Sequence, residues 1–322
     1  MRALFATLFL LMSHYATATV VHNEHQQQAQ KAEKILLDTF SASHSNSYEL
    51  SYLLIRQSSI EPLLFRHAMD GDKELSQLIY LSGPKREALQ KGDAISYLEP
   101  ASAPFTVRSK NIVGPLLPFI HQSVQSISAT YDFTYVGKSR EANVISDVIR
   151  VSPKDGLRYS YMLWVSEKDN LPLRVDLLDR NGDVIEQYRT VNYKVGQSVK
   201  ETLQAQLSIN LPEPMLFPDA SVEATSWEAS WLPKGFKAMN ASRYRLKYAD
   251  RMVESRIYSD GLFQFSVYIA KKDAYSMQNK GVRQGRRMIY SMTSEEHEIS
   301  IVGDLPPETA QRIAQSIQFM TK

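Results

Sequence analysis

Short runs in which apolar and polar residues alternate recur from residue 48 to residue 195, and they constrain the fold more than any other feature. A period of two is typical of a strand with one buried face and one solvated face. Turn signals such as Asp70-Gly71 and Gly83-Pro84 separate the runs at hairpin distances. The runs predict an antiparallel meander of about ten strands. They read YELSYLLIR, PLLFRHAM, QLIYLS, REALQ, AISYLE, PFTVR, FTYVG, NVISDVIRV, RYSYMLWVS, LPLRVDLLD and VIEQYRTV.

The stretch DLLDRNGDVIE, residues 176–186, has the oxygen-rich composition of a calcium loop. An EF-hand loop with Gly182 at its sixth position would have Leu177 first and Tyr188 twelfth, where the metal needs acidic ligands. The pair Asn181-Gly182 between two alternating runs instead favours a hairpin with a type I′ turn. We therefore predict a hairpin here and no metal site.

Two apolar segments favour helices that would cover this sheet. The first, QQQAQKAEKILLDTF (residues 26–40), places alanines and larger apolar residues at helical spacing. The second, NIVGPLLPFIHQSVQSI (residues 111–127), is long and apolar, with Pro115 and Pro118 limiting its start to a loop or a first turn. A sheet of this size curls, so we expect both helices on its concave face.

A curled sheet with apolar helices across it can enclose a cavity for a lipid. The other interpretation is that the same side chains are simply core, because apolar stripes usually pack. The candidate lining residues are Phe105, Leu117, Phe119, Tyr161 and Trp164.

The chain is long enough for two domains. Residues 206–222 hold three prolines and lose all periodicity, which indicates a linker between a domain over residues 19–205 and one over residues 223–322. In the second domain, ESRIYSDGLFQFSVYI predicts a hairpin, RRMIYSM and HEISIVG predict strands, and LPPETAQRIAQSIQFM predicts a closing helix. The predicted fold class is α+β, a large curved antiparallel sheet followed by a smaller β-rich domain.

The N-terminus has the features of a secretory signal peptide. Arg2 is positively charged, residues 3–12 are apolar, and small residues at Ala16 and Ala18 precede an expected cut after Ala18. The apolar run is too short to span a bilayer as a helix. We expect residues 1–18 to be removed and the mature protein to be soluble in an extracytoplasmic compartment. No cysteine follows the cut, so no lipoprotein anchor is expected.

The net charge of +2 is unevenly distributed, because residues 223–322 hold 15 lysines and arginines against 11 acidic residues. This excess favours an acidic or anionic partner for the C-terminal domain. It is far too small to indicate nucleic acid, and the expected export argues against it as well. The absence of cysteine excludes disulfides, thiol catalysis and cysteine metal sites.

No catalytic motif is found. The chain lacks G-x-S-x-G and H-E-x-x-H, and its serines, acids and histidines show no spacing that singles out a catalytic group. We predict no enzyme activity and no cofactor. The cluster NKGVRQGRR, residues 279–287, suits carboxylates or phosphates because arginine forks bind both. The alternative is a solvated basic loop before a strand.

Several stretches in both domains resemble the RseB/MucB family of periplasmic sigma-E regulators, in family order. They include QLIYLSGPKREALQKGDAISYLEP, VIRVSPKDGLRYSYMLWV, LPLRVDLLDRNGDVIEQYR, WLPKGF, ESRIYSDGLFQFSV and IVGDLPPETAQRIAQSI. The resemblance implies a lipoprotein-carrier-like N-terminal domain. It also implies a periplasmic protein that binds the periplasmic region of a membrane-anchored anti-sigma factor, shields it from site-1 proteolysis, and senses mislocalised lipopolysaccharide or lipid.

The resemblance and the charge asymmetry together suggest a partner surface containing Arg256, Tyr258, Arg286 and Arg287, since arginine and tyrosine often anchor interfaces. The alternative is that these groups are solvated or stabilise their own sheet. Two rival functions stay open, a lipid or lipoprotein carrier and a hydrolase. The oligomeric state, including a homo-oligomer, is not decided by the sequence.

Overall fold

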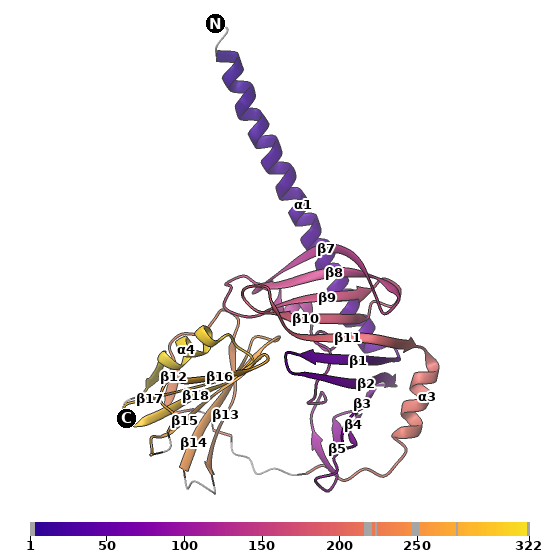
Figure 1. Cartoon of the computed structure of the whole chain (residues 1–322), viewed down its shortest axis with the longest axis vertical. Helices are drawn as coiled ribbons and strands as arrows, with labels where there is room; N and C mark the ends of the chain where they lie inside the picture. The colour runs from indigo at the N-terminus through magenta and orange to yellow at the C-terminus, as the bar shows by residue number, and fades with distance from the viewer. Residues whose placement is uncertain (1–3, 216–220, 223, 247–250, 275, 321–322) are drawn as a thin grey trace.

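The computed structural model describes residues 4–215, 221–222, 224–246, 251–274 and 276–320, with side chains described from residue 24 onward. Two β-rich domains lie side by side, and the long helix α1 (Leu4–Ser45) projects from the larger one (Figure 1). The expected cut after Ala18 falls within α1, and it stays a prediction. No described helix is long and apolar enough to cross a membrane.

The N-terminal domain is built on one open antiparallel sheet of 11 strands in the order β6-β5-β4-β3-β2-β1-β11-β10-β9-β8-β7. Every predicted run overlaps one of these strands, so the predicted meander is confirmed. Strand β1 pairs with β11, and this pairing joins the two halves of the meander into one sheet. The strands are β1 (Tyr48–Arg56), β2 (Ser59–Asp70), β3 (Lys73–Tyr80), β4 (Arg86–Lys91), β5 (Ala94–Leu98), β6 (Phe105–Arg108), β7 (Tyr131–Glu141), β8 (Val144–Pro153), β9 (Ser160–Ser166), β10 (Pro172–Leu178) and β11 (Val184–Val195).

The stretch at residues 176–186 is the predicted hairpin, between β10 and β11. The predicted type I′ turn is wrong, because Gly182 has a positive φ (91°) and Asn181 does not. The Asp179 carboxylate accepts hydrogen bonds from the backbone N–H groups of Asn181 and Asp183, which stabilises a longer loop than two residues. No group of three or more metal-ligating side chains occurs among the described residues.

The inner face of the sheet is covered by α1 and by the segment between β6 and β7. Residues 26–40 lie within α1, as predicted, and contribute Ala32 and Leu36 to the core. The helix predicted over residues 111–127 is wrong for most of its length, because only α2 (Val124–Ile127) is helical. Gly114 and the two prolines disfavour a continuous helix, and Phe119 has a positive φ of 73°.

This irregular segment is held to the sheet by side-chain hydrogen bonds to its backbone. The Tyr52 hydroxyl donates to the Pro115 carbonyl at 2.7 Å, and the Tyr97 hydroxyl accepts from the Val113 N–H at 2.9 Å. On the opposite face of the sheet, helix α3 (Gln197–Gln206) buries Val199 and Leu203 in a separate small core.

The C-terminal domain has a six-stranded antiparallel sheet in the order β13-β14-β15-β18-β17-β16, with helix α4 (Pro307–Gln315) packed on β17 and β18. The predicted hairpin and both predicted strands are confirmed. The closing helix is confirmed over Pro307–Gln315, but the last part of the predicted helix is wrong, because Ile317–Phe319 pair as a strand with Trp227–Ala229. The strands are β13 (Lys237–Leu246), β14 (Arg251–Ser259), β15 (Gln264–Lys271), β16 (Lys280–Gln284), β17 (Arg287–Ser294) and β18 (His297–Gly303), and a separate pair is formed by β12 (Trp227–Ala229) and β19 (Ile317–Phe319).

The predicted linker, residues 206–222, includes residues 216–220, which lie outside the described part of the chain. Its first half follows the larger sheet, where the Met215 N–H donates to the Thr106 carbonyl at 2.8 Å. The two domains share one continuous hydrophobic core, in which Tyr161 of β9 stacks on Phe263 of the C-terminal domain with ring centroids 5.3 Å apart. Their relative position is therefore set by packed side chains.

Candidate functional site

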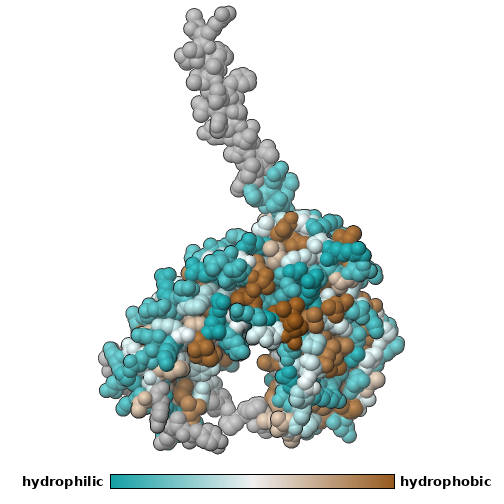
Figure 2. Space-filling model, in the orientation of Figure 1, coloured by the Kyte–Doolittle hydropathy of each residue, from teal (hydrophilic) through white to brown (hydrophobic). Residues whose placement is uncertain are grey.

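A cleft of about 660 Å³ lies where the β16–β17 hairpin of the C-terminal domain approaches the β1–β2 turn of the N-terminal domain. We call it the interdomain cleft. In the space-filling view the surface is hollowed between the two domains (Figure 2). The hairpin reaches the cleft through a two-residue turn, Gly285-Arg286, in which Gly285 has a φ of 59°. Glycine with positive φ at the first central position matches a type II′ turn, which suits the twist of the two strands.

The lining of the interdomain cleft is strongly charged and carries more arginines than acids. Five guanidinium groups face three carboxylates, so the cleft has a surplus of positive charge. Because the arginines come from both domains, this concentration of charge exists only where the two domains pack against each other. The charged lining residues are Arg56, Arg86, Arg283, Arg286, Arg287, Glu61, Glu186 and Asp304.

Two of the carboxylates are buried and connect the domains. Glu186 of β11 accepts from the Arg56 Nε at 2.8 Å and lies 3.7 Å from an Arg286 nitrogen. Asp304 lies 2.8 Å from the other terminal nitrogen of Arg286 and 3.7 Å from the Arg287 Nε. Arg286 thus bridges a carboxylate of each domain. One oxygen of Glu186 and one of Asp304 have no hydrogen-bond partner within the described residues.

Two further arginines of the hairpin are accessible to solvent. The Arg287 side chain is 64% exposed, and Arg283 is also exposed. No carboxylate lies within ion-pair distance of Arg283 among the residues that the structure describes. Burial raises the pKa of Tyr188, and the neighbouring Glu186 raises it further, so this wall of the cleft keeps a protonated hydroxyl. The surplus of arginines suits the cleft to binding an anionic group.

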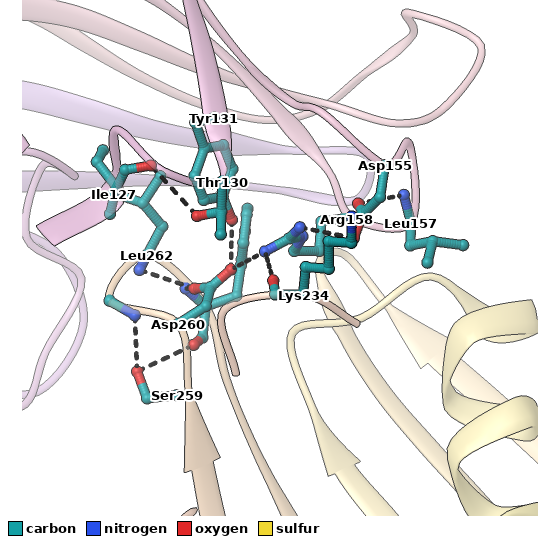
Figure 3. A network of polar contacts seen from close by, with 12 residues as sticks. Ile127, Thr130, Tyr131, Asp155, Leu157, Arg158, Lys234, Ser259, Asp260 and Leu262 are labelled. Atoms are coloured by element: carbon teal, nitrogen blue, oxygen red, sulfur yellow. Dashed lines mark hydrogen bonds and ion pairs between the residues drawn. The ribbon is translucent and has the colours of Figure 1, made fainter. Parts of the chain in front are cut away.

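A second set of polar contacts fixes the domains beside the cleft (Figure 3). The Arg158 guanidinium, 1% exposed, donates to Asp260 at 2.8 Å, to the Lys234 carbonyl at 2.9 Å and to Asp155 at 2.8 Å. The Tyr131 hydroxyl donates to the same Asp260 oxygen at 2.5 Å. Burial and the neighbouring Asp260 carboxylate raise the pKa of Tyr131, which keeps this hydroxyl protonated.

Three of the five predicted lipid-pocket residues belong to the hydrophobic core. Leu117 and Phe119 are buried, and Phe119 contacts Tyr161 edge to face with centroids 5.2 Å apart. Tyr161 lies between Phe119 and Phe263, so it belongs to the domain interface. The concave face is thus filled by the protein's own side chains at these positions.

The other two residues lie away from that core. Trp164 is on the opposite face of β9 from Tyr161, because strand neighbours alternate, and the Arg174 guanidinium covers its ring at 4.0 Å. It cannot line a cavity together with Tyr161, and this part of the prediction is wrong. Phe105 is half-buried at the far end of the sheet, stacked on Tyr97.

The four predicted partner-binding residues do not form one surface. Tyr258 is 3% exposed and stacks on Phe265 within the C-terminal core, so its predicted exposure is wrong. Arg256 lies over the Trp227 ring at 5.8 Å. Arg286 and Arg287 both line the interdomain cleft, but Arg286 is engaged in linking the domains. Of the four, Arg287 has the side chain best placed to meet a partner.

The sequence analysis missed the N-terminal side of the cleft. Arg56 and Arg86 appeared only as polar positions of predicted strands, Glu61 fell between two predicted runs, and Glu186 appeared only as part of a hairpin. Opposite charges on adjacent strands offered a weak signal, since Arg56 lies opposite Glu186 in the β1–β11 register. These four residues pair with one another on the N-terminal sheet, but only the contact between the domains places them opposite the arginines of the β16–β17 hairpin, and the sequence pattern does not encode that contact.

Two family models match the chain in order. The model of the MucB/RseB N-terminal domain covers residues 31–209, and that of the MucB/RseB C-terminal domain covers residues 221–318. The chain belongs to the MucB/RseB family. Among relatives of this family, the sigma-E factor regulatory protein RseB of Salmonella typhimurium is 43% identical over 279 residues, which cover 86% of this chain and 87% of the relative. RseB of Escherichia coli K12 is 42% identical over the same lengths.

Solved structures of the family share the fold. The complex of Pseudomonas aeruginosa MucA and MucB includes a chain that matches with a TM-score of 0.74 and 22% identity, covering 91% of this chain and all of that one. MucB in complex with MucA(peri) matches with a TM-score of 0.70 and 23% identity, covering 90% of this chain and all of that one.

Proposed function

We propose that this protein is a periplasmic negative regulator of the sigma-E envelope stress response. It binds the periplasmic region of a membrane-anchored anti-sigma factor and shields that region from site-1 proteolysis. The observation that carries the proposal is the match of both MucB/RseB domains over nearly the whole chain. The names of the relatives, regulators of sigma-E and of AlgU, and the complexes of MucB with MucA support it.

The geometry supports a binding role. The interdomain cleft combines an excess of arginines with a solvent-facing hairpin, which suits recognition of an acidic segment. A regulator needs neither a catalytic constellation nor a cofactor, and none is proposed here.

We also propose that an amphipathic lipid, such as lipopolysaccharide, promotes release of the anti-sigma factor. Part of the inner face of the N-terminal sheet, beside α1, is covered by the irregular segment around Leu117 and Phe119. Acyl chains would replace these side chains against the sheet, so lipid entry and the resting packing of this segment are mutually exclusive. A carrier that holds its cargo in a permanently open pocket fits this filled face less well.

The test uses the mature protein and the purified periplasmic region of the cognate anti-sigma factor. Calorimetry measures their affinity, and a digestion time course with the site-1 protease measures protection. The expected result is a stable complex that slows cleavage, and that dissociates when lipopolysaccharide is titrated in. The polysaccharide freed from its lipid part is the matched control. Cleavage at the same rate with and without the protein would exclude the shielding function, and survival of the complex at saturating lipopolysaccharide would exclude the lipid response.

A further inference from the structure

Strand β16 is an unpaired edge of the C-terminal sheet. It pairs with β17 on one side and ends the strand order on the other. All five of its residues are exposed. An exposed edge strand presents a row of free N–H and C=O groups and is a template for another strand.

The free backbone groups can be assigned from the register. The two-residue turn joins Gln284 to Arg287, so this pair and the pair Val282–Ile289 exchange hydrogen bonds within the hairpin. The alternate residues, Gly281 and Arg283, direct their N–H and C=O groups away from β17. Within the described residues, neither makes a backbone hydrogen bond outside the ladder.

The charge on this edge selects the kind of strand it can accept. Arg283 lines the interdomain cleft and also a second cavity of about 320 Å³ beside α4. It lies opposite Met288, whereas Val282 lies opposite the exposed Ile289 on the other face of the hairpin. A strand added here would meet a guanidinium on one face and apolar side chains on the other.

We propose that β16 captures an extended acidic segment of the partner by strand addition, with partner backbone groups bonded to Gly281 and Arg283. The segment alternates carboxylates, directed toward Arg283, with apolar residues packed on Val282 and Ile289. This inference rests on the proposed function, since the segment belongs to the anti-sigma factor. Strand addition supplies affinity through main-chain bonds, and the side-chain alternation supplies specificity.

A peptide strand would need both the Arg283 guanidinium and the backbone edge of β16, and this distinguishes it from a simple anion. A phosphate from lipid or solution would use the guanidinium of Arg283 and would be indifferent to the backbone edge. A peptide strand needs the outward N–H of Arg283 as well. Proline at this position removes that N–H while leaving the bonds to β17 intact, because only outward-facing edge positions tolerate proline.

The experiment measures the Kd of the purified anti-sigma periplasmic region for wild-type protein and for the variants Arg283→Ala, Arg283→Pro and Lys280→Ala. Thermal melts check that each variant is folded. Lys280→Ala removes one positive charge from the same strand and should change Kd by less than about twofold. Arg283→Ala should weaken binding about tenfold, and Arg283→Pro by about tenfold more.

Each outcome decides a separate point. Equal Kd values for Arg283→Ala and Arg283→Pro would overturn strand addition. If inorganic phosphate then also displaces the segment, Arg283 forms a site for an anion only. A wild-type Kd for folded Arg283→Ala would overturn the contact with Arg283. Amide exchange gives a second measurement, because Gly281 and Arg283 should become protected in the complex. If the wild-type protein does not bind the anti-sigma segment, the proposed function itself is refuted, whatever the variants show.

Discussion

Removal of the buried Asp260 carboxylate should weaken both the fold and the coupling of the two domains. Asp260 accepts hydrogen bonds from Arg158, from the Tyr131 hydroxyl and from the backbone N–H groups of Leu262 and Phe263. In Asp260→Ala all four donors lose this acceptor. The Arg158 side chain is almost fully buried, so its charge is left with less compensation in a region of low polarity.

The expected loss in the free energy of unfolding depends on the bonds that Arg158 keeps in the variant. Breaking a buried ion pair from one side typically costs about 3–5 kcal/mol. Arg158 keeps its bonds to Asp155 and to the Lys234 carbonyl, so the loss in unfolding free energy should lie near the lower end, about 3 kcal/mol. Adding Arg158→Met to this variant should recover part of the loss, because the buried charge that Asp260 no longer compensates is then removed.

Urea unfolding followed by circular dichroism measures this loss, and limited proteolysis of the folded state measures uncoupling of the domains. Asp93→Ala is the matched control, because Asp93 pairs with Arg108 at 2.7 Å where both side chains are 66% exposed. That pair should contribute less than about 1 kcal/mol. A loss in Asp260→Ala no larger than in Asp93→Ala would refute the assignment of Asp260 as the central interdomain acceptor.

Four further outcomes are expected. Gly303→Ala should cost about 2 kcal/mol or more in urea unfolding, since a Cβ there would lie 2.4 Å from the backbone of β15. Gly281→Ala should cost less, because the close contact of its Cβ would be with the flexible end of Met288. Burial lowers the pKa of His67 from 6.5 to about 4, so the neutral imidazole stabilises the fold above pH 6.5, and this stabilisation is lost as the pH falls toward 4. In His67→Gln the free energy of unfolding, measured from pH 7 to pH 4, should therefore depend less on pH. Leu117→Ala should lower the unfolding free energy by about 2–5 kcal/mol, and an unchanged melting temperature would instead favour the pocket interpretation. Arg287→Ala should leave stability within about 0.5 kcal/mol yet slow association with the anti-sigma segment in stopped-flow measurements, because its guanidinium is exposed in the cleft.

The local pattern was sufficient for most of the strands. Alternation with a period of two and Gly-containing turns depend only on neighbouring residues, so they predicted every strand of the larger sheet and the hairpin at residues 176–186. Helix α3 was missed, although Val199 and Leu203 lie four residues apart on one face. The basic stretch at residues 279–287 was weighed as a loop, but pairing with β17 makes its first half a strand.

Tertiary contacts decided the state of the segment over residues 111–127. Its apolar composition predicted a helix, whereas in the structure its backbone is satisfied by the hydroxyls of Tyr52 and Tyr97 from the sheet. Such bonds join residues far apart in sequence, so a helical period cannot report them. The same limit applies to Tyr161, which is a partner of Phe263 only because the C-terminal domain packs there.

The sequence by itself determined every strand of the larger sheet and the central strands of the smaller one, but not β12, β13, β16 or β19. It also gave the division into two domains as an expectation and the resemblance to a family of regulators, because each depends on residues close together or on order along the chain. Only the tertiary structure decided which charged groups meet. Glu186 and Asp304 are more than 100 residues apart, and Arg286 joins them because the two domains share one core. Charge in a cleft depends on distance in space, which packing of the domains sets and which no local pattern contains.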